Sequence, residues 1–196
     1  MAFTPGTRGR NLLLEGLVVV LVGSGFSTAP SAAGTALSVR DASSAQAREV
    51  TDAVDHFRAA GLELPPLQIA FHEDASGCQG RPGYYQEGTV DVCTGATVNR
   101  YSETLLIHEM AHAWSERALN NSERRRFMDL VDVPTWSSWD MPWRDRGWEY
   151  AAEIIRWGIY GVTTPRVPYR SIGELENAYE FLTGDTPPIL GGTPLT

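Results

Sequence analysis

SETLLIHEMAHAWS, residues 102–115, is the stretch of sequence that decides the fold. It carries His108 and His112 four positions apart, with Glu109 directly after the first histidine. Its apolar residues recur at helical spacing, and the opening Ser-Glu pair is typical of a helix start. Because residues four apart lie on one face of a helix, one turn apart, both imidazoles can reach a single metal ion. We therefore predict a helix that presents two metal ligands and a carboxylate beside them.

A reactive metal site needs a third protein ligand and an open position for water. The metzincin pattern would place glycine and histidine at positions where Ser115 and Ala118 stand, so that pattern is excluded. Glu149 and Glu153 stand four apart in WEYAAEIIRW, a second helix-like run that is otherwise largely apolar. Two carboxylates at this spacing are common on solvated helix faces, but in an apolar helix they need a compensating cation. We predict Glu149 as the third ligand.

This arrangement resembles the gluzincin branch of the zincin metallopeptidases, of which thermolysin is the familiar member. The resemblance spans the two helix-like runs and the segment between them. It implies one Zn²⁺ per chain held by His108, His112 and Glu149, with Glu109 as the general base and Glu153 orienting the ring of His108. The gap before the second run is longer than in thermolysin, and its second acidic residue is glutamate instead of aspartate. The two roles on the second run are therefore exchangeable at this stage.

The resemblance also implies an α+β fold, with a small twisted, mostly antiparallel sheet packed on the active-site helix and a helical C-terminal part. It implies hydrolysis of peptide or protein substrates, which would pair with an edge strand at Val90–Cys93 or the strand next to it. Tyr150 and Tyr160 are candidate oxyanion donors, with Tyr101 and His72 also open. The alternatives are a non-catalytic zinc-binding or interaction module on the same framework, and an amidase that acts on cell-wall peptides.

Residues 1–33 have the layout of a secretory signal peptide, with two arginines before a short apolar stretch and small residues after it. We expect secretion, with membrane or cell-wall retention as the alternative, and no stable membrane insertion once the signal is removed. Cys78 and Cys93 are expected to form a disulfide in an exported chain. The net charge of −8 argues against nucleic acid and anionic membranes as partners. The oligomeric state is left open.

We predict one domain over residues 45–184, between a flexible leader at 34–44 and a flexible tail at 185–196. Three tryptophans in residues 136–143 either line a cleft or pack their loop against the domain, and packing is the preferred interpretation. Periodicity predicts further helices over 45–60, 122–131 and from 171 or 172 to 182, and strands over 67–71, 84–86 and 89–94, the last two joined by a tight turn.

Overall fold

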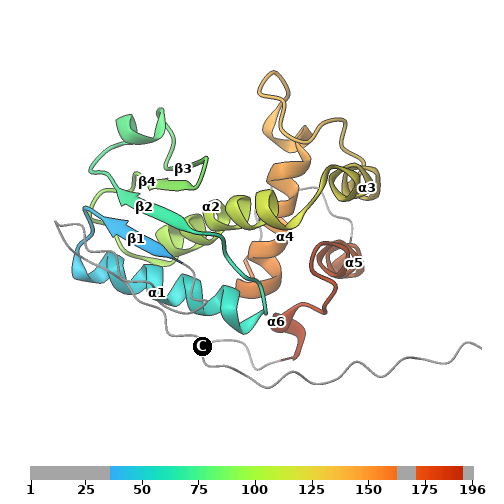
Figure 1. The fold of residues 1–196 in the computed structure, drawn as a ribbon, viewed down its shortest axis with the longest axis horizontal. Coiled ribbons are helices and arrows are strands. Elements are labelled where there is room, and N and C mark those ends of the chain that lie inside the picture. Colours follow the sequence, from blue (N-terminus) through green and yellow to red (C-terminus); the bar gives the residue numbers. More distant parts are fainter. Residues whose placement is uncertain (1–35, 163–170, 192–196) are drawn as a thin grey trace, which may run out of the picture.

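The computed structural model describes residues 36–162 and 171–191, which form a small sheet and a set of helices (Figure 1). The sheet has the strand order β1-β2-β4-β3. Strand β1 (Leu37–Arg40) runs parallel to β2 (Leu67–Phe71), and β2 runs parallel to β4 (Thr89–Val92). Strand β3 (Gly83–Gln86) pairs antiparallel with β4 and forms one edge of this sheet. The α+β class is therefore confirmed.

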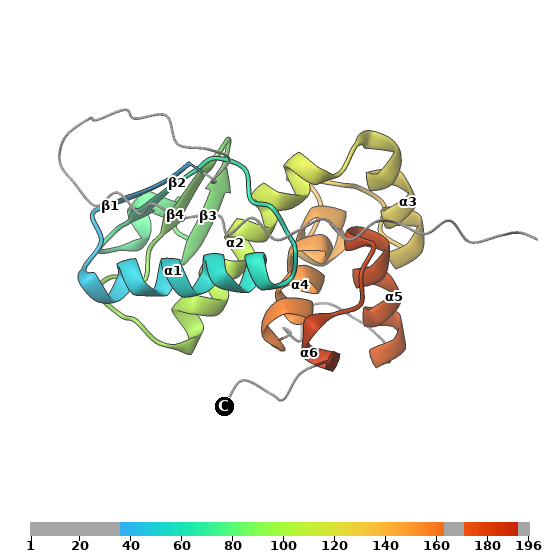
Figure 2. The ribbon, with the colours of Figure 1, turned by 60° about the horizontal axis from the view of Figure 1, so that its bottom comes forward.

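Helix α1 (Ser44–Ala59) covers one face of the sheet (Figure 2). The Ser43 side chain accepts from the backbone of Gln46, and the Gln46 side chain accepts from the backbone of Ser43. This capping box satisfies backbone N–H donors that the first helical turn leaves free, so it fixes where the loop after β1 ends and α1 begins. The apolar stripe of α1 joins the buried side chains of the strands in the core. The helix predicted over 45–60 is confirmed.

The prediction of a mostly antiparallel sheet is wrong, because two of its three pairings are parallel. One parallel pairing joins β2 to β4, and the other comes from strand β1, which lies inside the segment predicted to be a flexible leader. The chain leaves β1, passes through α1 and returns as β2, and a crossover of this kind makes neighbouring strands parallel. Four alternating residues are too short a signal for the sequence to reveal that strand.

The hairpin of β3 and β4 is confirmed, and its turn consists of Glu87 and Gly88, both with positive φ (46° and 82°). Two positive φ angles in a two-residue turn match the twist of the flanking strands. The predicted edge strand needs a correction within its stated alternatives. Strand β4 lies inside the sheet, so the strand next to it, β3, is the edge.

Helix α2 (Arg100–Ala118) begins at the cap Asn99, and every residue from Leu106 to Ser115 is buried. It lies against β3 and β4 on one side and against α4 (Gly147–Tyr160) on the other. Beyond α2 the helices α3 (Asn121–Val131), α5 (Ile172–Thr183) and α6 (Pro188–Gly191) surround α4 (Figure 1). A Cβ at Gly158 would lie 2.1 Å from the Tyr179 ring, so glycine permits the close contact of α4 with α5.

The ends of the chain divide into described and undescribed parts. The predicted signal peptide, residues 1–33, lies outside the described residues. The predicted flexible tail contains the short helix α6, and residues 192–196 lie outside the described part. No helix in the described ranges is long and apolar enough to cross a bilayer.

The predicted disulfide between Cys78 and Cys93 is confirmed. It joins the short 3-10 helix η1 (Ala75–Cys78) to the residue that follows β4. The amide of Cys93 also donates to the carbonyl of Pro82 at 2.8 Å. The loop before β3 is therefore held on the sheet by a covalent bond and a backbone hydrogen bond.

Replacing both Cys78 and Cys93 by serine should lower the free energy of unfolding by about 3 kcal/mol, because a closed loop of about 15 residues restricts the unfolded chain. Urea unfolding of the two proteins, each with and without a thiol reductant, measures the loss. The reductant should destabilise the unsubstituted chain and leave the serine variant unchanged. Equal midpoints for all four samples would contradict a stabilising disulfide.

Candidate metal centre

The contact of α2 with α4 brings one carboxylate against two imidazoles. Glu149 Oε2 lies 3.3 Å from His108 Nε2 and 3.3 Å from His112 Nε2. One ligand atom from each of these three residues lies within 4.8 Å of the other two. The group could therefore hold a metal ion, and it consists of the three ligands named from the sequence.

The chemistry of these donors fits a divalent transition metal. Two imidazole nitrogens and one carboxylate oxygen make a ligand set typical of zinc sites that keep a fourth position open. The two histidine side chains are buried and Glu149 is nearly so. A buried carboxylate is costly unless a cation compensates its charge, and Arg146 approaches Glu149 only to 4.0 Å. Bound metal would supply that cation.

Glu153 lies on the far side of His108 from Glu149. Its Oε1 is 2.9 Å from His108 Nδ1, and its Oε2 forms an ion pair with Arg156. A carboxylate at Nδ1 holds the proton on that nitrogen and leaves the Nε2 lone pair for a metal. Of the two carboxylates whose roles were exchangeable, Glu149 is therefore the one that faces the shared ligand position.

Electrostatics around the metal-free site favour a bound positive charge. Burial alone would lower the pKa of His108, but its contacts with Glu149 and Glu153 outweigh burial and raise the pKa to about 10. Burial would raise the pKa of Glu149, yet the two histidines hold that pKa well below its usual range. Burial also raises the pKa of Glu109, and the neighbouring histidines offset only part of that effect. The carboxylates around His108 therefore favour a positive charge at this point.

Glu109 lies between the ligand group and strand β3. Its side chain is buried, and its Oε1 would be 2.9 Å from a Cβ placed on Gly83. The same Cβ would be 2.9 Å from Leu105 Cδ1. Glycine at this point of the edge strand therefore allows the backbone to approach the carboxylate. The sequence carried no signal for this role of Gly83.

The ligand group opens into a cavity of about 640 Å³. Its walls come from three places: the β3 edge with the loop before it, helices α2 and α4, and the loop between α3 and α4. Aromatic side chains dominate the walls, and three arginines interrupt them. These residues are Arg81, Tyr84, Tyr85, Tyr101, Trp139, Trp143, Arg146, Trp148 and Arg156.

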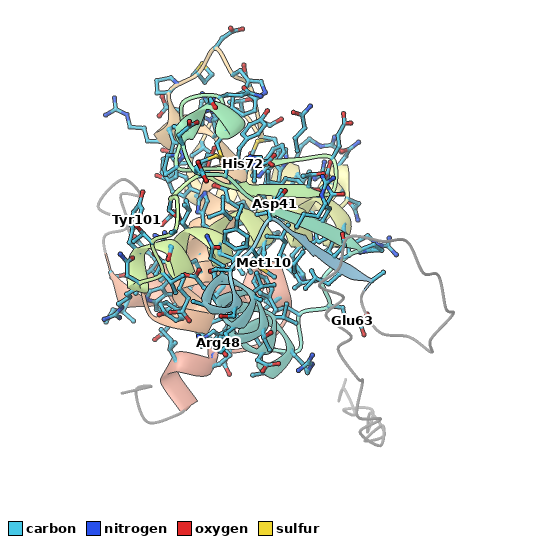
Figure 3. The ribbon with its side chains drawn as sticks, turned by 90° about the vertical axis from the view of Figure 1, so that its left-hand side faces the viewer. Asp41, Arg48, Glu63, His72, Tyr101 and Met110 are labelled. Atoms are coloured by element: carbon cyan, nitrogen blue, oxygen red, sulfur yellow. A yellow bond between two sulfur atoms is a disulfide. The ribbon has the colours of Figure 1, made fainter. Side chains whose placement is uncertain are left out.

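The two tyrosines named as oxyanion donors do not line this cavity. Tyr160 lies eleven residues after Glu149 on α4, about 16 Å along the axis, and its hydroxyl donates to Glu103. Tyr150 follows Glu149 directly and is buried in the core, because adjacent helical residues point in different directions. His72 pairs with Asp91 Oδ1 at 2.6 Å and is also outside the cavity walls. Of the four candidate donors, only Tyr101 lines the cavity. It is exposed near the start of α2 (Figure 3).

The tryptophans of the loop before α4 divide between the two interpretations. The ring of Trp136 packs edge-on against that of Phe127, with 6.3 Å between the ring centroids, which is the preferred packing role. Trp139 and Trp143 line the cavity. The Trp143 ring stacks on the His108 ring, with 6.2 Å between their centroids. Trp148, which the sequence did not single out for the cavity, packs against His112 at 5.0 Å.

Sequence reasoning also missed the three arginines of the cavity. Arg156 follows Glu149 and Glu153 at positions i+7 and i+3, so the helical period could have placed it on the same face. Arg146 directly precedes α4. It donates from Nε to the Met141 carbonyl at 2.9 Å, and its Nη1 lies 4.0 Å from Glu149 Oε1. Arg81 lies in an irregular loop and has no pattern that could have indicated its position.

Gly83→Ala should destabilise the fold by about 1–2 kcal/mol, because the added methyl group must displace Glu109 or Leu105 in a packed interior. Gly173→Ala is the matched control, since a Cβ there meets only Ser171 Oγ at 3.9 Å on helix α5. Alanine favours a helix over glycine, so the control should be neutral or slightly stabilised. Urea unfolding measures both variants, and equal stability of the two would contradict the close approach at Gly83.

Comparison with protein-family models, with proteins of curated function and with solved structures found no match to this chain. The donors, distances and burial at the site are therefore what any functional proposal for this chain rests on.

Proposed function

We propose that this chain is a secreted, zinc-dependent metallopeptidase that hydrolyses peptide bonds with Glu109 as general base. The observation that carries the proposal is the convergence of His108, His112 and Glu149 on one point, with Glu109 buried beside them and a cavity in front. Zinc bound there would polarise a carbonyl and lower the pKa of a bound water to about 7. The disulfide supports export, because such bonds persist in oxidising compartments.

Glu109 supports catalysis over a purely structural metal site. It is not one of the three grouped ligands, yet its carboxyl is buried at the same place. Burying a carboxyl that binds no metal costs free energy, so a framework that needed only a metal would gain nothing from it. In the proposed reaction Glu109 takes the proton of the attacking water and passes it to the leaving amine. Its raised pKa brings the carboxyl closer to the range in which both transfers are easy.

The remaining polar residues have positioning roles. Glu153 keeps the proton of His108 on Nδ1, and Arg156 fixes Glu153 through their ion pair. Arg146 holds the loop before α4 through the carbonyls of Met141 and Trp139. Tyr101 is the remaining tyrosine candidate for an oxyanion donor, since it alone of the three named lines the cavity.

Strand β3 is the proposed docking edge for the substrate. It is an edge of the described sheet, and Gly83, Tyr84 and Tyr85 line the cavity. An extended peptide can add to such an edge through backbone hydrogen bonds, with its side chains entering pockets alternately. Because Gly83 lies against Glu109, a peptide on this edge passes the proposed general base.

Glu109→Gln should keep one equivalent of zinc and lower kcat by about 10²–10⁴-fold, because the amide cannot accept the proton of the water. The measurement is turnover of a mixed peptide library by the zinc-loaded chain, followed by mass spectrometry. Glu180→Gln on the exposed side of α5 is the control and should retain full turnover. Full activity in Glu109→Gln would sink the mechanism.

Zinc affinity should rise with pH by about tenfold per unit between about pH 6 and pH 8. The pKa of His108 is about 10 before zinc binds, so throughout this range binding releases one proton, and that release becomes more favourable as the proton activity of the solution falls. Competition with a chromophoric chelator, corrected for the chelator's own titration, measures the affinity. Glu153→Gln should flatten the dependence, because it removes one of the carboxylates that raise this pKa. An affinity independent of pH in the unsubstituted chain would contradict a protonated His108.

A further inference from the structure

Three arginines line the cavity of a chain whose net charge is −8. Two of them are already engaged within the protein. Arg156 is buried in an ion pair with Glu153, and Arg146 donates to two backbone carbonyls and lies near Glu149. The third, Arg81, is exposed at the mouth of the cavity.

Arg81 has no ion-pair partner among the carboxylates of the described residues. Its guanidinium instead lies over two aromatic rings, 4.8 Å from the centroid of Trp139 and 5.3 Å from that of Tyr84. Trp139 has Arg146 against it as well, at 4.9 Å. Stacking uses the face of a guanidinium and leaves the N–H donors around its edge available. Arg81 is thus a positioned cation whose forked donors match a carboxylate.

The position of Arg81 before the edge strand β3 indicates which end of a bound peptide would lie near its guanidinium. Arg81 comes two residues before Gly83, the point where β3 meets Glu109. A peptide that pairs antiparallel with β3 runs toward its own C-terminus as β3 is followed back toward its start. The part of such a peptide near Arg81 therefore lies on the C-terminal side of the bond beside Glu109.

We propose that Arg81 is a specificity-determining residue that selects substrates with a carboxylate on the C-terminal side of the cleaved bond. That a bond is cleaved rests on the proposed peptidase function. The preference for a carboxylate rests on the geometry of Arg81. An acidic side chain and a free C-terminus present the same carboxylate, so either can supply it. Trp139 and Tyr84 orient Arg81 and are not themselves required to contact the charge.

Binding and cleavage are measured separately. Zinc-loaded Glu109→Gln protein selects ligands from two peptide libraries, one with amidated and one with free C-termini, and mass spectrometry reads the enrichment. We expect about tenfold enrichment of acidic over neutral residues in the amidated library, or of free over amidated neutral peptides. The first result assigns an acidic side chain and the second a C-terminus. Equal retention of acidic, neutral and basic peptides in the amidated library, together with equal retention of free and amidated peptides, overturns the proposal.

Variants of Arg81 in the same background connect the preference to this residue. Arg81→Gln should abolish the enrichment, and Arg81→Glu should reverse it toward lysine and arginine, a gain that misfolding cannot imitate. Arg144→Gln is the matched control, because Arg144 is exposed, pairs with Asp145 at 3.9 Å and does not line the cavity. A preference that survives Arg81→Gln overturns the proposal.

Cleavage of the same libraries by the unsubstituted chain tests the direction. Cuts with the carboxylate on their C-terminal side support the proposal, and cuts with it on their N-terminal side overturn it. An absence of cleavage together with intact acidic enrichment would count against the peptidase function and still support carboxylate selection by Arg81.

Discussion

The structure depends on a contact between two helices, α2 and α4, that brings buried imidazoles and carboxylates together. Helix α4 places Glu149 against His108 and His112 of α2, and Glu153 against the other nitrogen of His108. Arg156 completes the group by pairing with Glu153. Each of these charges is tolerable in the interior because its neighbours compensate it, and loss of one leaves another unpaired. The demand for a cation at the centre is the electrostatic consequence of this arrangement.

The sheet contributes to the site by positioning the backbone of its edge strand beside the ligand group. The β3–β4 hairpin runs along α2, and glycine at position 83 lets its backbone reach Glu109. The disulfide and the Cys93 to Pro82 hydrogen bond hold the preceding loop, which carries Arg81. The edge strand, Glu109 and Arg81 are therefore held in one order along the cavity. In the proposed function, this order gives a bound peptide substrate a preferred direction across the ligand group.

The loop between α3 and α4 forms the opposite wall. Arg146 ties it down through backbone carbonyls, and Trp139 reaches toward the β3 side, where it meets Arg81. Trp143 and Trp148 pack against the two histidines. Aromatic walls of this kind lower the effective dielectric constant around the ligand group, which strengthens the electrostatic interactions inside it. The same side chains thus stabilise the loop and shape the environment of the site.

The sequence by itself determined most of the local elements and named the residues of the candidate ligand group, with the roles of Glu149 and Glu153 still exchangeable. Helical spacing places His108 and His112 on one face of α2, and Glu149 and Glu153 on one face of α4. The Glu87-Gly88 turn defines a hairpin. The sequence records these features because each pattern spans only a few residues. Tertiary structure alone decided the parallel pairing of β1, the edge position of β3, and the exclusion of Tyr150 and Tyr160 from the cavity. It also brought Arg81, Trp139 and Arg146 together from two loops. Such contacts join residues far apart in the chain, and no local period records which distant partner a strand or a loop will meet.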